Sequence, residues 1–220
     1  FVMKIDLREI PVMWISLDSA TENHKAMEEM FKEHGFKNTT RFSALKIPPH
    51  KEADPTIRHY RGCAESHIHC MRRLKKQGVP FLILEDDAKI TEDFEPIIDV
   101  EPGVDAVYLG ISHGNQNYEA RYLNNGFSKI EGVFATHAIL WTSKGAVEFC
   151  EKVARHFIWN LNTPFDIACA NELQKKYNVI TPLRPFFYQA DERDSSNKWE
   201  NLTKEPLNTK KKSVIHTIGY

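Results

Sequence analysis

Long apolar segments are missing from this sequence, and no apolar run approaches the roughly 20 residues that a helix needs to cross a membrane. Residues 1–10 carry four charged side chains, which excludes the apolar core of a signal peptide there. An excess of one charge is also missing, because the formal net charge is −1 at pH 7. We therefore expect no membrane span and no nucleic-acid partner.

Cysteine is scarce, with four residues in 220, and no two of them form a Cys-x-x-Cys pair. This number and spacing exclude a disulfide framework. The simplest interpretation is buried, reduced thiols in a cytoplasmic protein. The remaining composition, 41% hydrophobic and 27% charged, is that of an ordinary globular protein, and we expect residues 1–220 to form a single domain.

The most informative stretch is an apolar run that leads directly into three acidic residues. Residues 81–84 read as a strand buried on both faces, and Glu85, Asp86 and Asp87 follow. Three adjacent carboxylates repel one another unless a cation or hydrogen-bond donors lie among them. Ligands of open α/β sheets bind beyond the carboxyl ends of the strands. The stretch therefore predicts a Mn²⁺ or Mg²⁺ site, and the alternative is a solvated turn.

Predicted strands and helices alternate along the chain. We expect strands at residues 11–17, 40–45, 105–110, 133–141, 179–180 and 185–189, helices at 20–34, 60–77, 144–156 and 164–177, and a hairpin at 121–130. Asp18 and Ser19 offer an N-cap for the first helix. This alternation predicts an α/β fold with a mostly parallel sheet between layers of helices. Residues 46–57, rich in proline, are expected to be a loop, and the polar residues 191–212 a mobile segment.

Three further motifs accompany the acidic strand and give the chain a resemblance to a known family. They are Gly62-Cys63-Ala64-Glu65-Ser66-His67, the strand-to-helix stretch from Phe134 to Ala146, and Pro164-Phe165-Asp166-Ile167. In this order, over roughly residues 12–189, they resemble glycosyltransferase family 25, and small viral glycosyltransferases are also similar. The resemblance implies a Rossmann-related GT-A fold and a nucleotide-sugar donor.

The resemblance also implies roles for the acidic residues and the first loop. The acidic cluster lies where the GT-A fold keeps its Asp-x-Asp motif, so Asp87 and Asp86 are expected to bind the metal. Glu85 or Asp86 is expected to contact the ribose or a metal-bound water. Ser16, Leu17 and Asp18 match the first-loop nucleotide contacts, although the family usually has Asn-Leu followed by several basic residues there.

Two histidines are candidates for the phosphate end of the donor. Ser66 and His67 read as opening a helix whose first-turn amides could receive a phosphate. The alternative for both residues is a capping or core role. Near the end of the chain, His216 lies in a His-x-x-Gly stretch that resembles the metal-binding histidine of some retaining GT-A enzymes, and Lys210 to Lys212 precede it. A solvated basic tail is the alternative.

Asp166 is the preferred candidate for the general base that deprotonates an acceptor hydroxyl, and Asp191 is the competing carboxylate. The alternative for Asp166 is a first-turn carboxylate that the helix dipole favours. Trp159 and Trp199 could stack on sugar rings.

The sequence thus predicts a catalytic domain for metal-dependent transfer of a sugar, from a donor expected to be a UDP-sugar, to a hydroxyl of a glycan or glycoprotein. A non-catalytic nucleotide-sugar-binding protein of the same fold is the alternative. A metal-dependent phosphohydrolase is a third interpretation, and it lacks the second carboxylate cluster that a two-metal site requires.

Overall fold

The structure is a computed structural model that describes residues 1–112, 115 and 117–190. Several residues singled out from the sequence lie outside the described residues, namely Asp191, Trp199, Lys210 to Lys212 and His216. The same holds for the segment 191–212 that was expected to be mobile.

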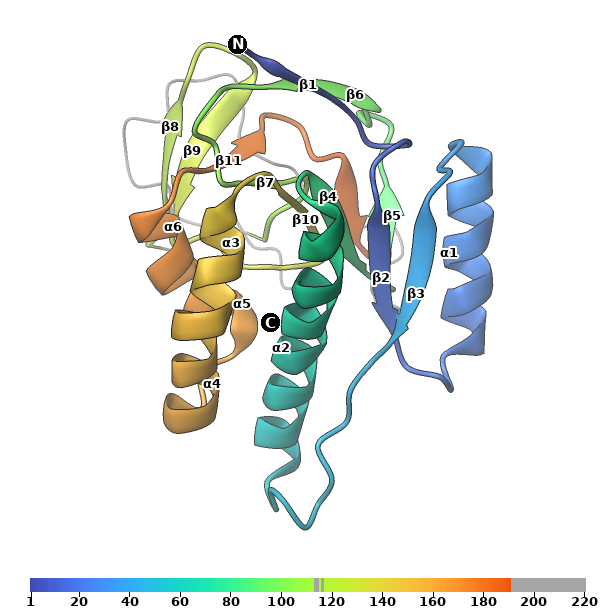
Figure 1. The fold of residues 1–220 in the computed structure, drawn as a ribbon, viewed down its shortest axis with the longest axis vertical. Coiled ribbons are helices and arrows are strands. Elements are labelled where there is room, and N and C mark those ends of the chain that lie inside the picture. The colour runs from blue at the N-terminus through green and yellow to red at the C-terminus, as the bar shows by residue number, and fades with distance from the viewer. Residues whose placement is uncertain (113–114, 116, 191–220) are drawn as a thin grey trace.

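The described residues form one sheet of eight strands and two sheets of two strands (Figure 1). The large sheet contains β2 (Val12–Ser16), β3 (Thr39–Ser43), β4 (Phe81–Glu85), β7 (Ala106–Tyr108), β8 (Glu119–Tyr122), β9 (Phe127–Glu131), β10 (Ala138–Trp141) and β11 (Val179–Pro182). Its strand order is β3-β2-β4-β10-β7-β11-β9-β8. The small sheets pair β1 (Met3–Asp6) with β6 (Ile97–Val100) and β5 (Ala88–Ile90) with β12 (Phe187–Gln189).

The helices of the described residues are α1 (Thr21–Glu33), α2 (Pro55–Leu74), α3 (Lys144–Glu148), α4 (Arg155–Leu161), α5 (Phe165–Ala168) and α6 (Gln174–Lys176). A π-helical segment, Phe149–Ala154, joins α3 to α4, and a second one, Cys169–Leu173, joins α5 to α6. The helices predicted at residues 144–156 and 164–177 are therefore each continuous, with a π-helical segment in the middle. No helix in this part of the chain combines the length and the apolar character that crossing a membrane requires.

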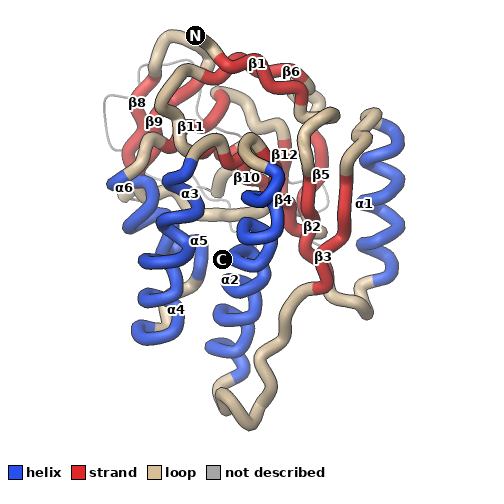
Figure 2. Tube along the Cα trace, viewed as in Figure 1, coloured by secondary structure: helices blue, strands red, loops and turns tan. Residues whose placement is uncertain are grey.

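Strand β4 lies inside the sheet and is buried on both faces, as its unbroken apolar sequence predicted. Phe81 and Ile83 face a core formed with α2 and with the α3 to α6 region, whereas Leu82 and Leu84 face a second core formed with α1, β1 and β6. All four side chains are fully buried. Figure 2 shows the two helix groups on different sides, with α2 to α6 together and α1 beside β2 and β3.

The expectation of a mostly parallel sheet is wrong, because the sheet is mixed. Among the described residues, three strand pairs of the large sheet are parallel and four are antiparallel. The decisive strand is β10, which enters between β4 and β7 and runs antiparallel to both. The chain between β7 and β10 contains the β8–β9 hairpin instead of a crossover helix, so no connection forces a parallel strand.

The N-terminal ends of α1 and α2 both differ from the prediction. Residue Ala20 occupies the N-cap position of α1 without a side-chain cap, because the Asp18 carboxylate instead accepts hydrogen bonds from Arg41 (2.9 Å) and Ser43 (2.8 Å). Helix α2 begins at Pro55, since proline fits the first helical position and the Asp54 carboxylate accepts from the next two free amides.

The early start of α2 corrects the expected role of the Ser66 and His67 amides. These residues lie about three turns inside the helix, where backbone amides already donate to the preceding turn. Their amides cannot receive a phosphate, and only their side chains remain available to a site.

Two irregular backbone features have a local cause. The β8–β9 hairpin is confirmed, with positive φ angles at Asn124 (62°) and Gly126 (86°). The strand expected from residue 133 begins only at Ala138, and Ala135 has a φ of 85°. This irregular backbone precedes β10 and brings Thr136 next to the acidic cluster.

Candidate functional site

Glu85, the last residue of β4, is held between helix α2 and the segment before β10. Its Oε1 accepts a hydrogen bond from Thr136 Oγ1 (2.8 Å) and lies 2.9 Å from Nε2 of His67. The imidazole of His67 packs against the ring of Phe165, with 4.6 Å between the ring centroids. Burial favours the protonated form of Glu85, but the bonds from His67 and Thr136 outweigh it and lower the pKa of Glu85. These two bonds therefore favour the ionised form of Glu85.

Asp86 turns toward the end of β2 and the first turn of α1. Its Oδ2 accepts hydrogen bonds from Ser16 Oγ (2.6 Å) and Asn23 Nδ2 (3.0 Å), and its amide donates to the carbonyl of Ile15 (3.1 Å). These bonds join the acidic turn to the carboxyl end of the neighbouring parallel strand β2. Ser16 and Asp86, predicted separately as donor contacts, thus form one hydrogen-bonded unit.

Asp87 has the fewest partners of the three carboxylates. Its Oδ2 accepts a hydrogen bond from Gln189 Nε2 (2.9 Å), while Oδ1 is buried without a hydrogen-bond partner among the described residues. Burial, followed by the negative charges of Glu85 and Asp86, raises the pKa of Asp87 to about 7. A buried carboxylate oxygen without a donor and with a raised pKa fits a position where a cation binds.

A cavity of about 480 Å³ opens beside Glu85 and Asp86 and is bounded by the loops that follow β2 and β3 and by α2. Six of the predicted donor-binding residues line it: Ser16, Leu17, Ser66, His67, Glu85 and Asp86. The seventh, Asp18, does not line this cavity, because its carboxylate faces β3. The volume of this cavity is within the range of small-molecule binding sites.

Lys46, Arg58 and His59 bring basic groups to the wall of this cavity. Arg58 is held through Nη1 by the carbonyls of Glu52 (2.9 Å) and Ala53 (2.8 Å), and it forms no ion pair with a carboxylate of the described residues. Its charge is therefore available to an anionic ligand.

The wall formed by residues 44–47 packs against α2 through the backbone of Leu45, whose amide contacts Ser66 and whose carbonyl lies next to Gly62. The Ser66 hydroxyl donates to the carbonyl of Gly62 (2.7 Å) and accepts from the amide of Leu45 (2.9 Å). A Cβ on Gly62 would lie 2.5 Å from the Leu45 carbonyl oxygen, so only glycine permits this approach. The buried Ser66 thus shapes the cavity through Leu45.

A second cavity of about 400 Å³ adjoins the first, since His59, Cys63 and Glu85 line both. Asp166 lines this second cavity together with Thr136 and Gln189. It occupies the first turn of the short helix α5, where its Oδ1 accepts from the amide of Ile167 (2.9 Å).

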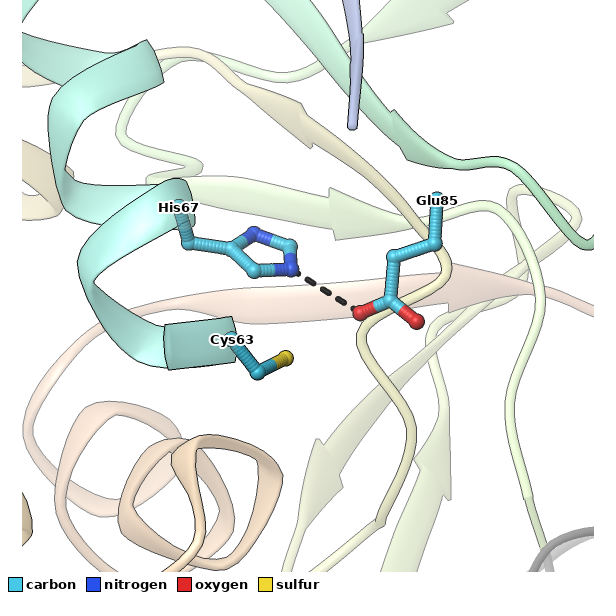
Figure 3. A group of neighbouring side chains, drawn as sticks. All are labelled: Cys63, His67 and Glu85. Atoms are coloured by element: carbon cyan, nitrogen blue, oxygen red, sulfur yellow. Dashed lines mark hydrogen bonds and ion pairs between the residues drawn. The ribbon is translucent and has the colours of Figure 1, made fainter. Parts of the chain in front are cut away.

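Cys63 and His67 of α2 point toward Glu85, as Figure 3 shows. One ligand atom from each of the three side chains lies within 4.8 Å of the others. Burial, and then the charges of Glu85, Asp166 and Asp87, raise the pKa of the Cys63 thiol well above its usual range.

Trp159 lies in α4 outside both cavities. Its side chain is 36% exposed, and its Nε1 donates to Glu65 Oε1 (2.8 Å). The guanidinium of Arg61 covers one ring face at 4.6 Å from the centroid, which leaves less aromatic surface for a sugar.

Several residues of the two cavities were not among the site residues predicted from the sequence, and they include Asn23, Arg58, Cys63 and Gln189. Cys63 carried a usable signal, because Cys63 and His67 are four positions apart on a predicted helix and so share one face. Arg58 lay in the border of a segment interpreted as loop, and Asn23 and Gln189 have no local signature.

One comparison with known proteins, that with solved structures, supports the fold. No family model matches the chain, and no curated protein matches it. Among solved structures, the chain is similar to a glycosyltransferase involved in the glycosylation of the major capsid of PBCV-1, with a TM-score of 0.50 and 15% sequence identity. The similarity covers 78% of this chain and 80% of that chain. The two proteins share a fold, while the resemblance to family 25 stays a prediction.

Proposed function

We propose that this protein is a metal-dependent glycosyltransferase that moves a sugar from a nucleotide sugar, expected to be a UDP-sugar, to a hydroxyl of a glycan or glycoprotein. The observation that carries the proposal is the acidic turn after β4 at the border of two adjoining cavities, with Glu85 lining both. Transfer requires this arrangement, since donor and acceptor must meet at one reacting carbon. The fold shared with the capsid glycosyltransferase supports the same class.

The nucleotide is assigned to the larger cavity. Ser16, Asn23 and Asp86 supply polar groups at one end, and the residues 44–47 supply a mostly apolar wall. Arg58 brings a positive charge without a carboxylate partner among the described residues, and a diphosphate needs such a charge.

Asp87 would hold the metal, because its Oδ1 is a buried carboxylate oxygen without a hydrogen-bond partner among the described residues. Asp86 is the second predicted ligand, and His216, outside the described residues, is the third. A bound Mn²⁺ or Mg²⁺ supplies positive charge that offsets the charge developing on the leaving nucleoside diphosphate.

The acceptor is assigned to the smaller cavity, where Asp166 acts as the general base. Its carboxylate removes the proton of the acceptor hydroxyl while that oxygen attacks the anomeric carbon and the bond to the diphosphate breaks. Asp191 stays the competing candidate for the base.

The test combines Mn²⁺ with a panel of nucleotide sugars and measures both the melting temperature and the release of nucleoside diphosphate. A donor that stabilises the protein and is turned over with an acceptor supports the proposal. Binding without release supports a non-catalytic nucleotide-sugar-binding protein, and no binding of any donor contradicts both. Asp86→Asn should weaken donor binding, whereas Asp18→Asn, in the same loop region but outside the cavity, serves as the matched control.

A further inference from the structure

The Cys63, His67 and Glu85 side chains converge from two elements onto one point. Cys63 and His67 are one helical turn apart on α2, and Glu85 ends β4 opposite them (Figure 3). Their ligand atoms lie within 4.8 Å of one another, and the His67–Glu85 pair is at 2.9 Å. Around a tetrahedral ion with bonds of about 2.0–2.3 Å, ligand atoms stand roughly 3.3–3.8 Å apart. Small side-chain rotations would therefore reach that geometry.

The chemistry of this group differs from that of the acidic turn. A thiolate, an imidazole and a carboxylate form a ligand set typical of zinc, whereas Mn²⁺ and Mg²⁺ prefer oxygen ligands. Thr136 donates to Glu85 and would orient that ligand from behind.

Cys63 is also the accessible cysteine of the chain. It is partly exposed and lines both cavities, whereas Cys70, Cys150 and Cys169 are buried in the core. The nearby carboxylates of Asp87 and Asp166 make the surroundings negative, which favours a cation.

We propose that the chain binds one Zn²⁺ ion through Cys63 Sγ, His67 Nε2 and a Glu85 carboxylate oxygen, with the fourth position open to water from the cavities. Binding releases the thiol proton of Cys63 to solvent, and His67 binds through Nε2 as a neutral imidazole with its proton on Nδ1. The three proposed ligands do not include Asp87, and the site does not depend on the proposed transferase activity.

Cobalt provides a direct readout, because a thiolate bound to Co²⁺ gives a charge-transfer absorption band. Titration of the metal-free full chain with Co²⁺ should produce this band at one equivalent, and Zn²⁺ should abolish it by displacement. Cys63→Ser should lose the band and bind Zn²⁺ at least roughly 10–100-fold more weakly, the loss expected even for an outer partner of a metal ligand. His69→Ala should match the wild type, since His69 is exposed on α2 and pairs with Glu65.

The absence of a thiolate band in the wild type, or a band that persists in Cys63→Ser, would overturn the proposal. A measurement on the unmodified chain removes any dependence on the folding of variants: Zn²⁺ should slow alkylation of Cys63 by a maleimide. Equal alkylation rates with and without Zn²⁺ would also overturn it. Asp87→Asn should keep the cobalt band, because Asp87 is not one of the three proposed ligands. The cobalt experiment therefore tests the zinc site independently of the assignment of Mn²⁺ to Asp87.

Discussion

Replacing Asp87 by Asn tests the crowding of carboxylates at the end of β4. Without a metal, burial and the charges of Glu85 and Asp86 raise the pKa of Asp87 to about 7, from an ordinary value of 3.8. Asparagine has nearly the same shape, and its carbonyl oxygen can still accept the hydrogen bond from Gln189. The substitution therefore removes a charge and leaves the packing in place.

The sign of the effect follows from linkage. A carboxyl with a higher pKa in the folded chain stabilises the fold fully at pH below about 4, and this contribution is lost as the pH rises through about 7. The difference between the two pKa values corresponds to at most about 4 kcal/mol. We expect the metal-free Asp87→Asn variant to gain stability relative to the wild type over this range, approaching that limit near pH 8.

Mn²⁺ should narrow the difference in stability between the two proteins near pH 8. At roughly 100 times its dissociation constant, a bound ion stabilises the wild type by about 2.7 kcal/mol, and the variant should gain nothing. Urea unfolding from about pH 4 to pH 8, with chelator or with Mn²⁺, measures both effects. Asp18→Asn is the control, because Asp18 is exposed. If the stability of the wild type and of Asp87→Asn depended on pH in the same way, the raised pKa of Asp87 would be refuted. If Mn²⁺ stabilised both proteins equally, the role of Asp87 as a metal ligand would be refuted.

Three further predictions concern the two cavities. Asp166→Asn should lower turnover by roughly 10²–10⁴ and leave donor affinity within a few-fold, measured by steady-state kinetics and calorimetry; weaker donor binding with intact turnover would reject the base. Arg58→Gln should weaken binding of a nucleoside diphosphate by roughly 10–100-fold in calorimetry, while Arg61→Gln, whose charge is paired, should not; equal affinities would remove Arg58 from the diphosphate site. Gly62→Ala should destabilise the chain by roughly 1–3 kcal/mol in thermal unfolding, because the Leu45 carbonyl must move. Helix propensity alone would give about 1 kcal/mol of stabilisation, so a stabilised variant would contradict the contact.

The features that the sequence predicted well are those with a local cause. The apolar run 81–84 could only be a strand with both faces covered, and the structure buries all four side chains. The residues Asn124 and Gly126 supply the positive φ angles that a hairpin needs, and the hairpin forms there. In both cases the residues that specify the structure are neighbours in the chain.

Features set by distant contacts were not predictable in this way. The antiparallel direction of β10 depends on its pairing with β4 and β7, which are distant in the chain, and the sequence of β10 is apolar throughout. Pro55 was interpreted as a helix breaker, although proline at the first helical position starts a helix. The bond between Ser16 and Asp86 joins residues 70 positions apart, and neither residue alone indicates its partner.

The three carboxylates of the acidic cluster are adjacent in the sequence but have different neighbours and different expected roles. Successive side chains that leave a strand and enter a turn point in different directions, so the three carboxylates meet different neighbours. Helix α2 and Thr136 hold Glu85, whereas Ser16 at the end of β2 and Asn23 in α1 hold Asp86. Only Asp87 retains a buried oxygen without a donor among the described residues. The excess negative charge of the cluster is therefore offset at Asp87, by a proton when no metal is bound and by a cation when one is present. On this argument the proton and the metal compete for one carboxylate, and the affinity for Mn²⁺ should fall as the pH decreases below about 7.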